Sequence, residues 1–138
     1  MITAGLTTSF KEQVLLGVHD LVNDVLKIAL YTADANLGPD TTVYSTTDEV
    51  SGTGYTAGGE VLLNVLVQQG NGTGYATFDD PSWPGANFTV RGALIYNFTK
   101  GNKSIGVFNF GTDQTMVNQG FTIQLPADNP ETAVIRII

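Results

Sequence analysis

Apolar side chains recur with a helical period near the start of the chain. Between Ser9 and Asp24 they return every three or four residues, so one face of a helix would carry them. This face comprises Phe10, Val14, Leu15, Val18, Leu21, Val22 and Val25. Ser9 and Glu12 have the spacing of a capping box, in which each side chain accepts from the other's free backbone N–H. The pattern predicts an amphipathic helix over about residues 9–25, with Leu16 pointing away from its apolar face.

The apolar period then changes to that of β-strands. Residues alternate between apolar and mixed character over Leu26–Tyr31, which is typical of a strand with one buried face. Farther along, Val61–Val67 is almost continuously apolar and predicts a strand buried on both faces, deep in the core. The stretch between them, Thr32–Thr47, is rich in Thr, Asp and Asn and predicts a surface excursion. Loops of this kind often carry binding.

The second half of the chain has the pattern of an antiparallel sheet. Phe88–Tyr96 and Ser104–Phe110 flank a polar segment in which Gly101-Asn102 favours a tight reversal, so these runs predict a hairpin. Two further strands are predicted at Phe121–Leu125 and Ala133–Ile138. Many short strands with one helix indicate a mainly β protein, an antiparallel β-sandwich or barrel-like domain with one N-terminal amphipathic α-helix. Residues 1–138 are expected to form a single structural domain.

The amino-acid composition excludes several classes of binding partner. Only 14% of the 138 residues are charged, and 13 acidic against 6 basic side chains give a net charge of −7. Such a surface repels a phosphate backbone, so we expect no nucleic-acid partner. No apolar run approaches the roughly 20 residues of a membrane helix, and the first residues lack the features of a secretion signal, so we expect no membrane association. The absence of cysteine excludes disulfides and thiol chemistry.

The inventory of reactive groups is small. His19 is the single imidazole, and no nucleophile motif accompanies it, so a hydrogen-bonded or solvent-facing histidine is expected. The pairs Asp48-Glu49 and Asp79-Asp80 lack the spacing of an acid–base pair or a cation site. Gly52–Ala57 matches a relaxed dinucleotide fingerprint, but no helix is predicted after it, which favours a glycine-rich loop with positive φ angles. We therefore expect no catalytic residue, cofactor or metal.

Aromatic residues offer one binding hypothesis. Trp83 lies between two prolines, and together with Tyr44, Tyr55 and Tyr75 it could form a platform of the kind that binds sugars. The alternative is that Trp83 closes the core, as a lone tryptophan in a turn usually does. Both interpretations stay open at the level of sequence.

Five segments resemble a family of small virion proteins of tailed bacteriophages. They are Ser9–Asp20, Lys27–Thr32, Glu49–Gly59, Arg91–Asn97 and Ala133–Ile137, and the similarity covers almost the whole chain. The resemblance implies a structural protein of the phage particle, such as a head decoration or minor structural protein. It carries no catalytic residue across, which agrees with a sheet-rich chain that lacks reactive groups.

The leading hypothesis from the sequence is a capsid decoration, or cement, protein. It would be made in the bacterial host cytoplasm and reside on the capsid surface of the virion, binding between subunits of the major capsid protein, as a homotrimer placed by analogy at threefold positions. The expected contact segments are the helix, the Thr32–Thr47 excursion and the Trp83 turn, with Leu16, Tyr44 and Trp83 as candidate contact residues. A tail or head-to-tail connector component and a carbohydrate-binding host-adhesion module are the alternatives. An enzyme is not expected.

Overall fold

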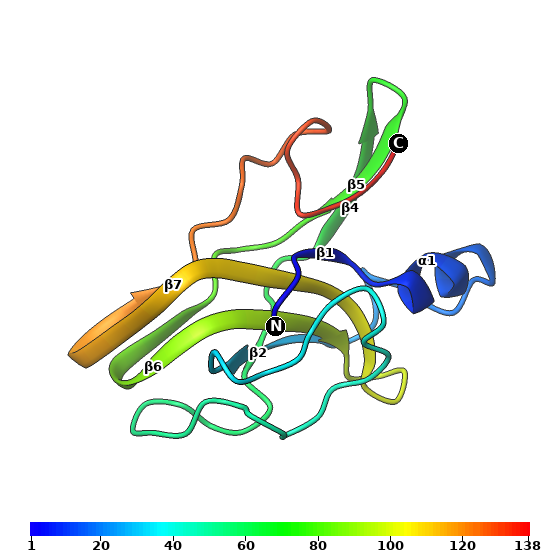
Figure 1. The fold of residues 1–138 in the computed structure, drawn as a ribbon. Coiled ribbons are helices and arrows are strands. Elements are labelled where there is room, and N and C mark those ends of the chain that lie inside the picture. The colour runs from blue at the N-terminus through cyan, green and yellow to red at the C-terminus, as the bar shows by residue number, and fades with distance from the viewer.

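The computed structural model describes all 138 residues and shows two antiparallel sheets and one short helix (Figure 1). A five-stranded sheet has the order β1-β7-β6-β2-β3, and a three-stranded sheet has the order β4-β5-β8. This architecture confirms the mainly β, sandwich-like fold class. The elements are β1 (Gly5–Leu6), α1 (Thr8–Leu15), β2 (Leu26–Tyr31), β3 (Glu60–Val61), β4 (Leu66–Gly70), β5 (Thr73–Thr77), β6 (Ser82–Asn97), β7 (Lys103–Thr122) and β8 (Ile135–Ile137).

The β6–β7 hairpin is the central ribbon of the molecule and confirms the clearest prediction from the sequence. Gly101 and Asn102 both have positive φ, 70° and 62°, and reverse the chain between the two strands. Both strands are longer than predicted and curve strongly along their length (Figure 1). Four register shifts interrupt the pairing, and such irregularities increase the bend of a ribbon. The strand predicted at Phe121–Leu125 is wrong as a separate element, because Phe121 and Thr122 are the last residues of β7.

The five-stranded sheet is buried on both faces around β2, whereas the far part of the β6–β7 ribbon is largely exposed. One face belongs to a core of eighteen residues that includes Ile28 and Leu30 of β2, Phe10 of α1, and Ala76 and Ile135 of the smaller sheet. The other face carries a second core of eight residues, made of Ile2, Ala29, Tyr31, Ala35, Leu37, Leu94, Tyr96 and Val107. The prediction of one buried face for β2 is therefore wrong, because the N-terminal residues and the excursion after β2 cover the face that was expected to meet solvent.

The helix is much shorter than predicted. It begins after Thr7, whose Oγ1 accepts a hydrogen bond of 3.3 Å from the backbone N–H of Phe10, so the capping box expected at Ser9 is wrong. It ends at Leu16, and Gly17 then adopts a φ of 72°, the left-handed conformation that closes many helices. Residues 17–25 continue as turns. Leu21 still packs against the core, which explains why the apolar period runs past the helix.

Val61–Val67 is not the buried strand that its composition predicts. Leu62 is buried, but Leu63 is 61% exposed, and Asn64 has a φ of 55° that breaks the extended chain. The segment divides into the last residue of β3, an irregular stretch and the first two residues of β4. Both strands lie at sheet edges, where an apolar side chain can remain in water. The structure thus reverses the expected burial of β2 and of this segment.

Candidate functional site

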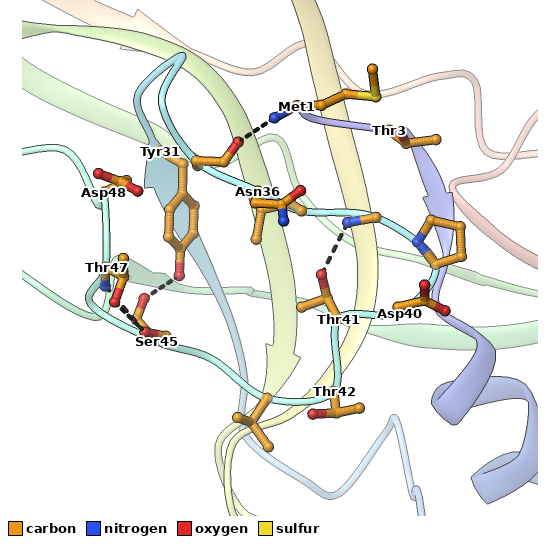
Figure 2. A pocket seen from close by; sticks show the side chains of 15 residues that line it. Met1, Thr3, Tyr31, Asn36, Asp40, Thr41, Thr42, Ser45, Thr47 and Asp48 are labelled. Atoms are coloured by element: carbon orange, nitrogen blue, oxygen red, sulfur yellow. Dashed lines mark hydrogen bonds between the residues drawn. The ribbon is translucent and has the colours of Figure 1, made fainter.

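A polar hollow of about 510 Å³ lies between the N-terminal residues and the excursion that follows β2 (Figure 2). The side chains of its wall are mostly short and uncharged, and Asp40 and Asp48 lie on opposite sides in this view. The hydroxyl groups that line it belong to Thr3, Tyr31, Thr41, Thr42, Ser45 and Thr47. Such a wall offers many hydrogen-bonding groups but little charge, which suits a polar protein surface better than a charged small molecule.

Backbone hydrogen bonds fix the excursion to distant parts of the chain. The N–H of Thr3 donates to the carbonyl of Leu37 at 2.8 Å, so the N-terminal residues run beside the excursion. At the other end, the N–H of Tyr44 donates to the carbonyl of Asn102 at 2.9 Å. The Ser104 hydroxyl donates to the carbonyl of Thr41 at 2.7 Å. The excursion is therefore a fixed shelf with little freedom to lose when a partner binds.

A carboxylate beneath this shelf collects three donors. Glu49 accepts hydrogen bonds from the hydroxyls of Tyr44 (2.7 Å) and Tyr55 and from the backbone N–H of Gly58 (2.8 Å). The Tyr44 ring also stacks on Tyr96 with 4.6 Å between ring centroids. The Tyr96 hydroxyl donates to the carbonyl of Gly58 at 2.6 Å. We call Tyr44, Glu49, Tyr55, Gly58 and Tyr96 the Glu49 cluster.

Burial raises the pKa of the tyrosines of this region above the ordinary value of 10. Loss of solvent is the largest cause of the raised pKa at each of them, and the nearby charge of Glu49 adds to it. The pKa of Tyr96 rises to about 12, and the pKa values of Tyr31, Tyr44 and Tyr55 are raised further. These hydroxyls therefore act as fixed hydrogen-bond donors at neutral pH, and their role is to hold the shelf in place.

The three candidate contact residues differ in how exposed they are in the structure. Leu16 is 69% exposed at the end of α1 and stays available to a partner. Tyr44 is half-buried, and its ring and hydroxyl are both engaged within the Glu49 cluster, so it positions the shelf. The prediction for Trp83 is wrong, because its side chain is 0% exposed and packs against Phe121. Trp83 closes the core, and its indole N–H has no hydrogen-bond partner.

Trp83 and the three tyrosines do not come together as the aromatic platform that the sequence left open for sugar binding. Trp83 is buried, and Tyr55 packs edge-on against Phe88 with its hydroxyl bonded to Glu49. Tyr44 stacks on Tyr96, so its face is covered. Tyr75 is half-buried on the other sheet, away from the other two tyrosines, with its hydroxyl donating to Gln68 at 2.9 Å.

Sequence reasoning missed an apolar groove between the helix region and the three-stranded sheet. It has a volume of about 480 Å³, with Val14 and Val22 on one side and Val67 and Ile137 on the other. In Figure 1, β4, β5 and the C-terminal end project together beside α1. Of the apolar run 61–67 only Val67 lines the groove, whereas Val14, Leu21 and Val22 belong to the apolar face that the sequence assigns to one long helix.

His19 is paired on both ring nitrogens. Its Nε2 lies 2.8 Å from Oε1 of Gln13, and its Nδ1 lies 3.0 Å from Nδ2 of Asn97. A neutral ring that donates from Nε2 and accepts at Nδ1 satisfies both contacts. Burial is the largest cause that lowers the pKa of His19, and Lys103 and Lys100 also lower it while Asp24 opposes them. The hydrogen-bonded histidine expected from the sequence is confirmed.

The other candidate motifs take structural positions. Gly54, with a φ of 90°, lies so close to β6 that an added Cβ would be 2.7 Å from the carbonyl oxygen of Gly85. The segment Gly52–Ala57 is a loop with no helix after it, so the glycine-rich loop interpretation is confirmed. Asp80 accepts from the backbone N–H of Leu125 at 3.1 Å and so joins the β5–β6 connection to the segment after β7. No three His, Asp or Glu side chains converge as metal ligands would, and no helix is long and apolar enough to cross a membrane.

No family model, curated protein or solved structure matches this chain.

Proposed function

We propose that this chain is a structural protein of a bacteriophage virion, and that it decorates the capsid by binding between subunits of the major capsid protein. The observation that carries the proposal is the fixed shelf of residues 32–48 with its polar hollow. A protein that reinforces a shell acts through interface area, and a rigid surface loses little entropy on docking. The shelf meets that requirement with hydrogen-bonding groups that are mostly hydroxyls.

The charge distribution supports a role on an outer surface. The net charge of −7 keeps the protein from binding packaged DNA and keeps neighbouring copies soluble before assembly. Few of these charges lie in the wall of the hollow, where hydroxyl groups dominate. The shelf itself carries three exposed carboxylates, Asp34, Asp40 and Asp48, so a partner has to leave them in water or pair them with basic groups, because burying an unpaired charge is costly.

Exposed apolar side chains supply further contact area. Leu15 and Leu16 stand at the end of α1, and Leu63, Leu66 and Val67 follow one another near the small sheet. Single exposed leucines or valines need no explanation, but grouped ones are typical of surfaces that meet a partner. We propose that these regions act with the shelf to hold neighbouring subunits, and that the protein works as a homo-oligomer.

Two measurements test the proposal. Quantitative mass spectrometry of purified particles gives the copy number relative to the major capsid protein. A ratio near one, or a large simple fraction of it, supports decoration, because only the icosahedral surface offers that many sites. A single ring of copies would instead favour the tail or head-to-tail connector, and absence from the particle would overturn a virion role.

A matched pair of variants tests the shelf itself. Thr42→Arg places a long cation in the wall of the hollow, whereas Thr112→Arg makes the same change on the exposed β6–β7 ribbon. We expect Thr42→Arg to lose at least tenfold in affinity for shells that lack the protein, as measured by co-sedimentation, and Thr112→Arg to bind normally. Equal binding by both variants would contradict docking through the shelf.

A further inference from the structure

Strand β4 forms an unprotected sheet edge. It lies at the outside of the three-stranded sheet, and four of its five residues are exposed. Its sequence, Leu66 to Gly70, contains no charged residue and no proline, and its pairing with β5 is regular throughout. Natural proteins normally protect such an edge with a charge, a proline, a bulge or a covering segment, because its free backbone groups can pair with another chain.

The other edges of the molecule carry those protections. Strands β1 and β3 are two residues long, and Glu60 places a charge in β3. Strand β8 has three residues, with Arg136 at its centre. The β6–β7 ribbon has four register shifts and the charge pair Arg91–Asp113. Only β4 combines length, regular pairing and neutrality.

The geometry of the β4–β5 hairpin shows which backbone groups are free. Asn71 and Gly72 form its two-residue turn with φ angles of 51° and 76°, the signs of a type I′ turn, in which Gly70 and Thr73 are hydrogen-bonded to each other. Bonded and non-bonded pairs alternate along an antiparallel ladder. The backbone N–H and C=O groups of Val67 and Gln69 therefore point away from β5.

We propose that β4 pairs with β4 of a second copy of this chain, antiparallel and about a two-fold axis that passes through Gln68. In this register Val67 of each copy faces Gln69 of the other, and the free groups of both residues form four N–H···O bonds. The two Gln68 residues face each other as a non-bonded pair. Joining the two edges makes one six-stranded sheet from two three-stranded ones.

Side chains fit this register. Gln68 accepts from Tyr75 through Oε1, so its amide N–H groups remain available to the other Gln68 across the axis. Leu66 faces Gly70 of the second copy, a position that has no side chain of its own and lies beside Pro130. The exposed leucine thereby gains an apolar neighbour. No position of β4 brings two like charges together.

Charge favours a second copy at this edge over the rest of the surface. Each copy carries a net charge of −7, so most contacts between two copies are repulsive. The neutral edge is a place where two such chains can meet without opposing carboxylates. The contact is smaller than the roughly 800 Å² per partner of a stable interface, so pairing should be weak in dilute solution and strengthened where copies are crowded on one surface.

This inference rests on the proposed function only in assuming that the protein forms a homo-oligomer. It predicts a two-fold pair in place of the homotrimer that was expected by analogy. Sedimentation velocity of the full chain, from about 10 to 500 μM, should show a monomer–dimer equilibrium.

Val67→Lys should leave a monomer at every concentration, because it puts a charge on the edge of β4. Val117→Lys is the matched control on the ribbon, where the valine is 70% exposed, and it should dimerise normally. A wild-type monomer throughout, or loss of the dimer in the control only, would overturn the pairing.

A single introduced thiol tests the register. The chain has no cysteine, so Gln68→Cys carries the one thiol of the protein. Facing residues of a non-bonded antiparallel pair lie about 4.5 Å apart at Cα, within the range that a disulfide spans. We expect mild oxidation to link Gln68→Cys into a covalent dimer, and Val117→Cys to stay largely monomeric. Equal linkage of the two variants, or none at Gln68→Cys, would overturn the two-fold register.

The outcomes separate this inference from the proposed function. A wild-type chain that decorates particles but stays monomeric in solution, and whose Gln68→Cys variant forms no covalent dimer, would retain the virion role and exclude the β4 contact. A chain that dimerises through β4 but is absent from particles would retain the contact and exclude the virion role. A trimer without the Gln68→Cys link would return the oligomer to threefold symmetry.

Discussion

The two sheets of this protein differ in how much of their surface is covered by other parts of the chain. The five-stranded sheet has a core on each face, and its outer strands are only two residues long. The three-stranded sheet shares part of one face with the larger core, leaves an apolar groove beside α1 and ends in the unprotected strand β4. Both sheets come from one chain of low charge, so composition does not cause the difference.

This difference separates the residues that stabilise the fold from those that are free to contact a partner. Where both faces of a sheet are covered, every strand contributes buried area and a change is felt throughout the core. Where a face and an edge remain open, side chains contribute little to folding and are free to meet another surface. We therefore expect changes in the larger sheet to alter the free energy of unfolding, and changes in the smaller sheet to alter association.

The largest effect is expected at Trp83, in the core of the larger sheet. Trp83→Ala should lower the free energy of unfolding by about 3–5 kcal/mol, because it removes a fully buried indole and leaves a cavity. Trp83→Phe is the matched variant and should cost about 1–2 kcal/mol, because it retains a ring and removes an N–H that has no partner. Urea denaturation followed by circular dichroism measures both. Equal costs would show that the indole is not tightly packed.

A smaller loss is expected at the Glu49 cluster, which joins the shelf to the larger sheet. Glu49→Ala should lower the free energy of unfolding by about 1–3 kcal/mol, because the hydroxyls of Tyr44 and Tyr55 and the N–H of Gly58 lose their acceptor. Hydrogen exchange should show faster opening of residues 44–58 with little change in β6. Uniform acceleration across the whole chain would contradict a local role.

Acid should weaken the contact between the turns after α1 and the larger sheet. The pKa of His19 is lowered from its usual value of 6.5, so below pH 6.5 the unfolded chain takes up a proton that the folded chain does not. Stability is therefore complete above that value and falls as the pH drops towards the lowered pKa. Asp20 and Asp24 also have lowered pKa values and lose their contribution only below their usual value of 3.8.

His19→Gln isolates the histidine contribution. The variant cannot titrate, so the unfolding midpoint in urea should change less between pH 7.5 and 5.5 than it does in the wild type. We expect the effect to be smaller than that of Glu49→Ala, because the ring is only partly buried. An identical pH dependence in both proteins would assign the acid response to other groups.

The smallest effect on folding is expected on the open sheet. Val67→Thr should change the free energy of unfolding by less than about 0.5 kcal/mol, because the side chain is 54% exposed at the edge. The same urea titration serves as the measurement. A loss comparable to that of Glu49→Ala would mean that the small sheet is as important for stability as the large one, and would break the comparison between them.

Local signals predicted the parts of the fold whose residues are close in sequence. The β6–β7 hairpin follows from two apolar runs around Gly101-Asn102, and both turn residues adopt the positive φ that their types favour. Strand β2 occupies the predicted residues Leu26–Tyr31. In both cases backbone preference and the apolar period agree, which is why a sequence-based argument succeeds there.

Burial was the property that local patterns misjudged. The apolar period of residues 9–25 combines a short helix with turns that pack on the same core, so periodicity alone overestimates the helix. Val61–Val67 has the composition of a central strand but lies at two edges. Whether an apolar residue is covered depends on segments far away in the sequence, and no local window contains them.

The candidate site was only partly visible in the sequence. The excursion after β2 was predicted as a loop suited to binding, and the structure places the polar hollow there. The Glu49 cluster was not predicted, because it brings Glu49 together with Tyr96, which lies on β6. The sequence left open whether Trp83 lies on the surface or closes the core, and the structure buries it against Phe121 at the end of the ribbon away from the hairpin turn.

The sequence by itself determined the mainly β class, the central hairpin, the position of β2 and the polar nature of the excursion, because short-range turn chemistry and apolar period specify these features. The tertiary structure alone decided which sheet faces are covered and where the helix ends. It also decided that Trp83 is buried and that β4 is an exposed sheet edge. Those outcomes depend on contacts between residues far apart in the chain, and such contacts are set by the packing of the whole fold.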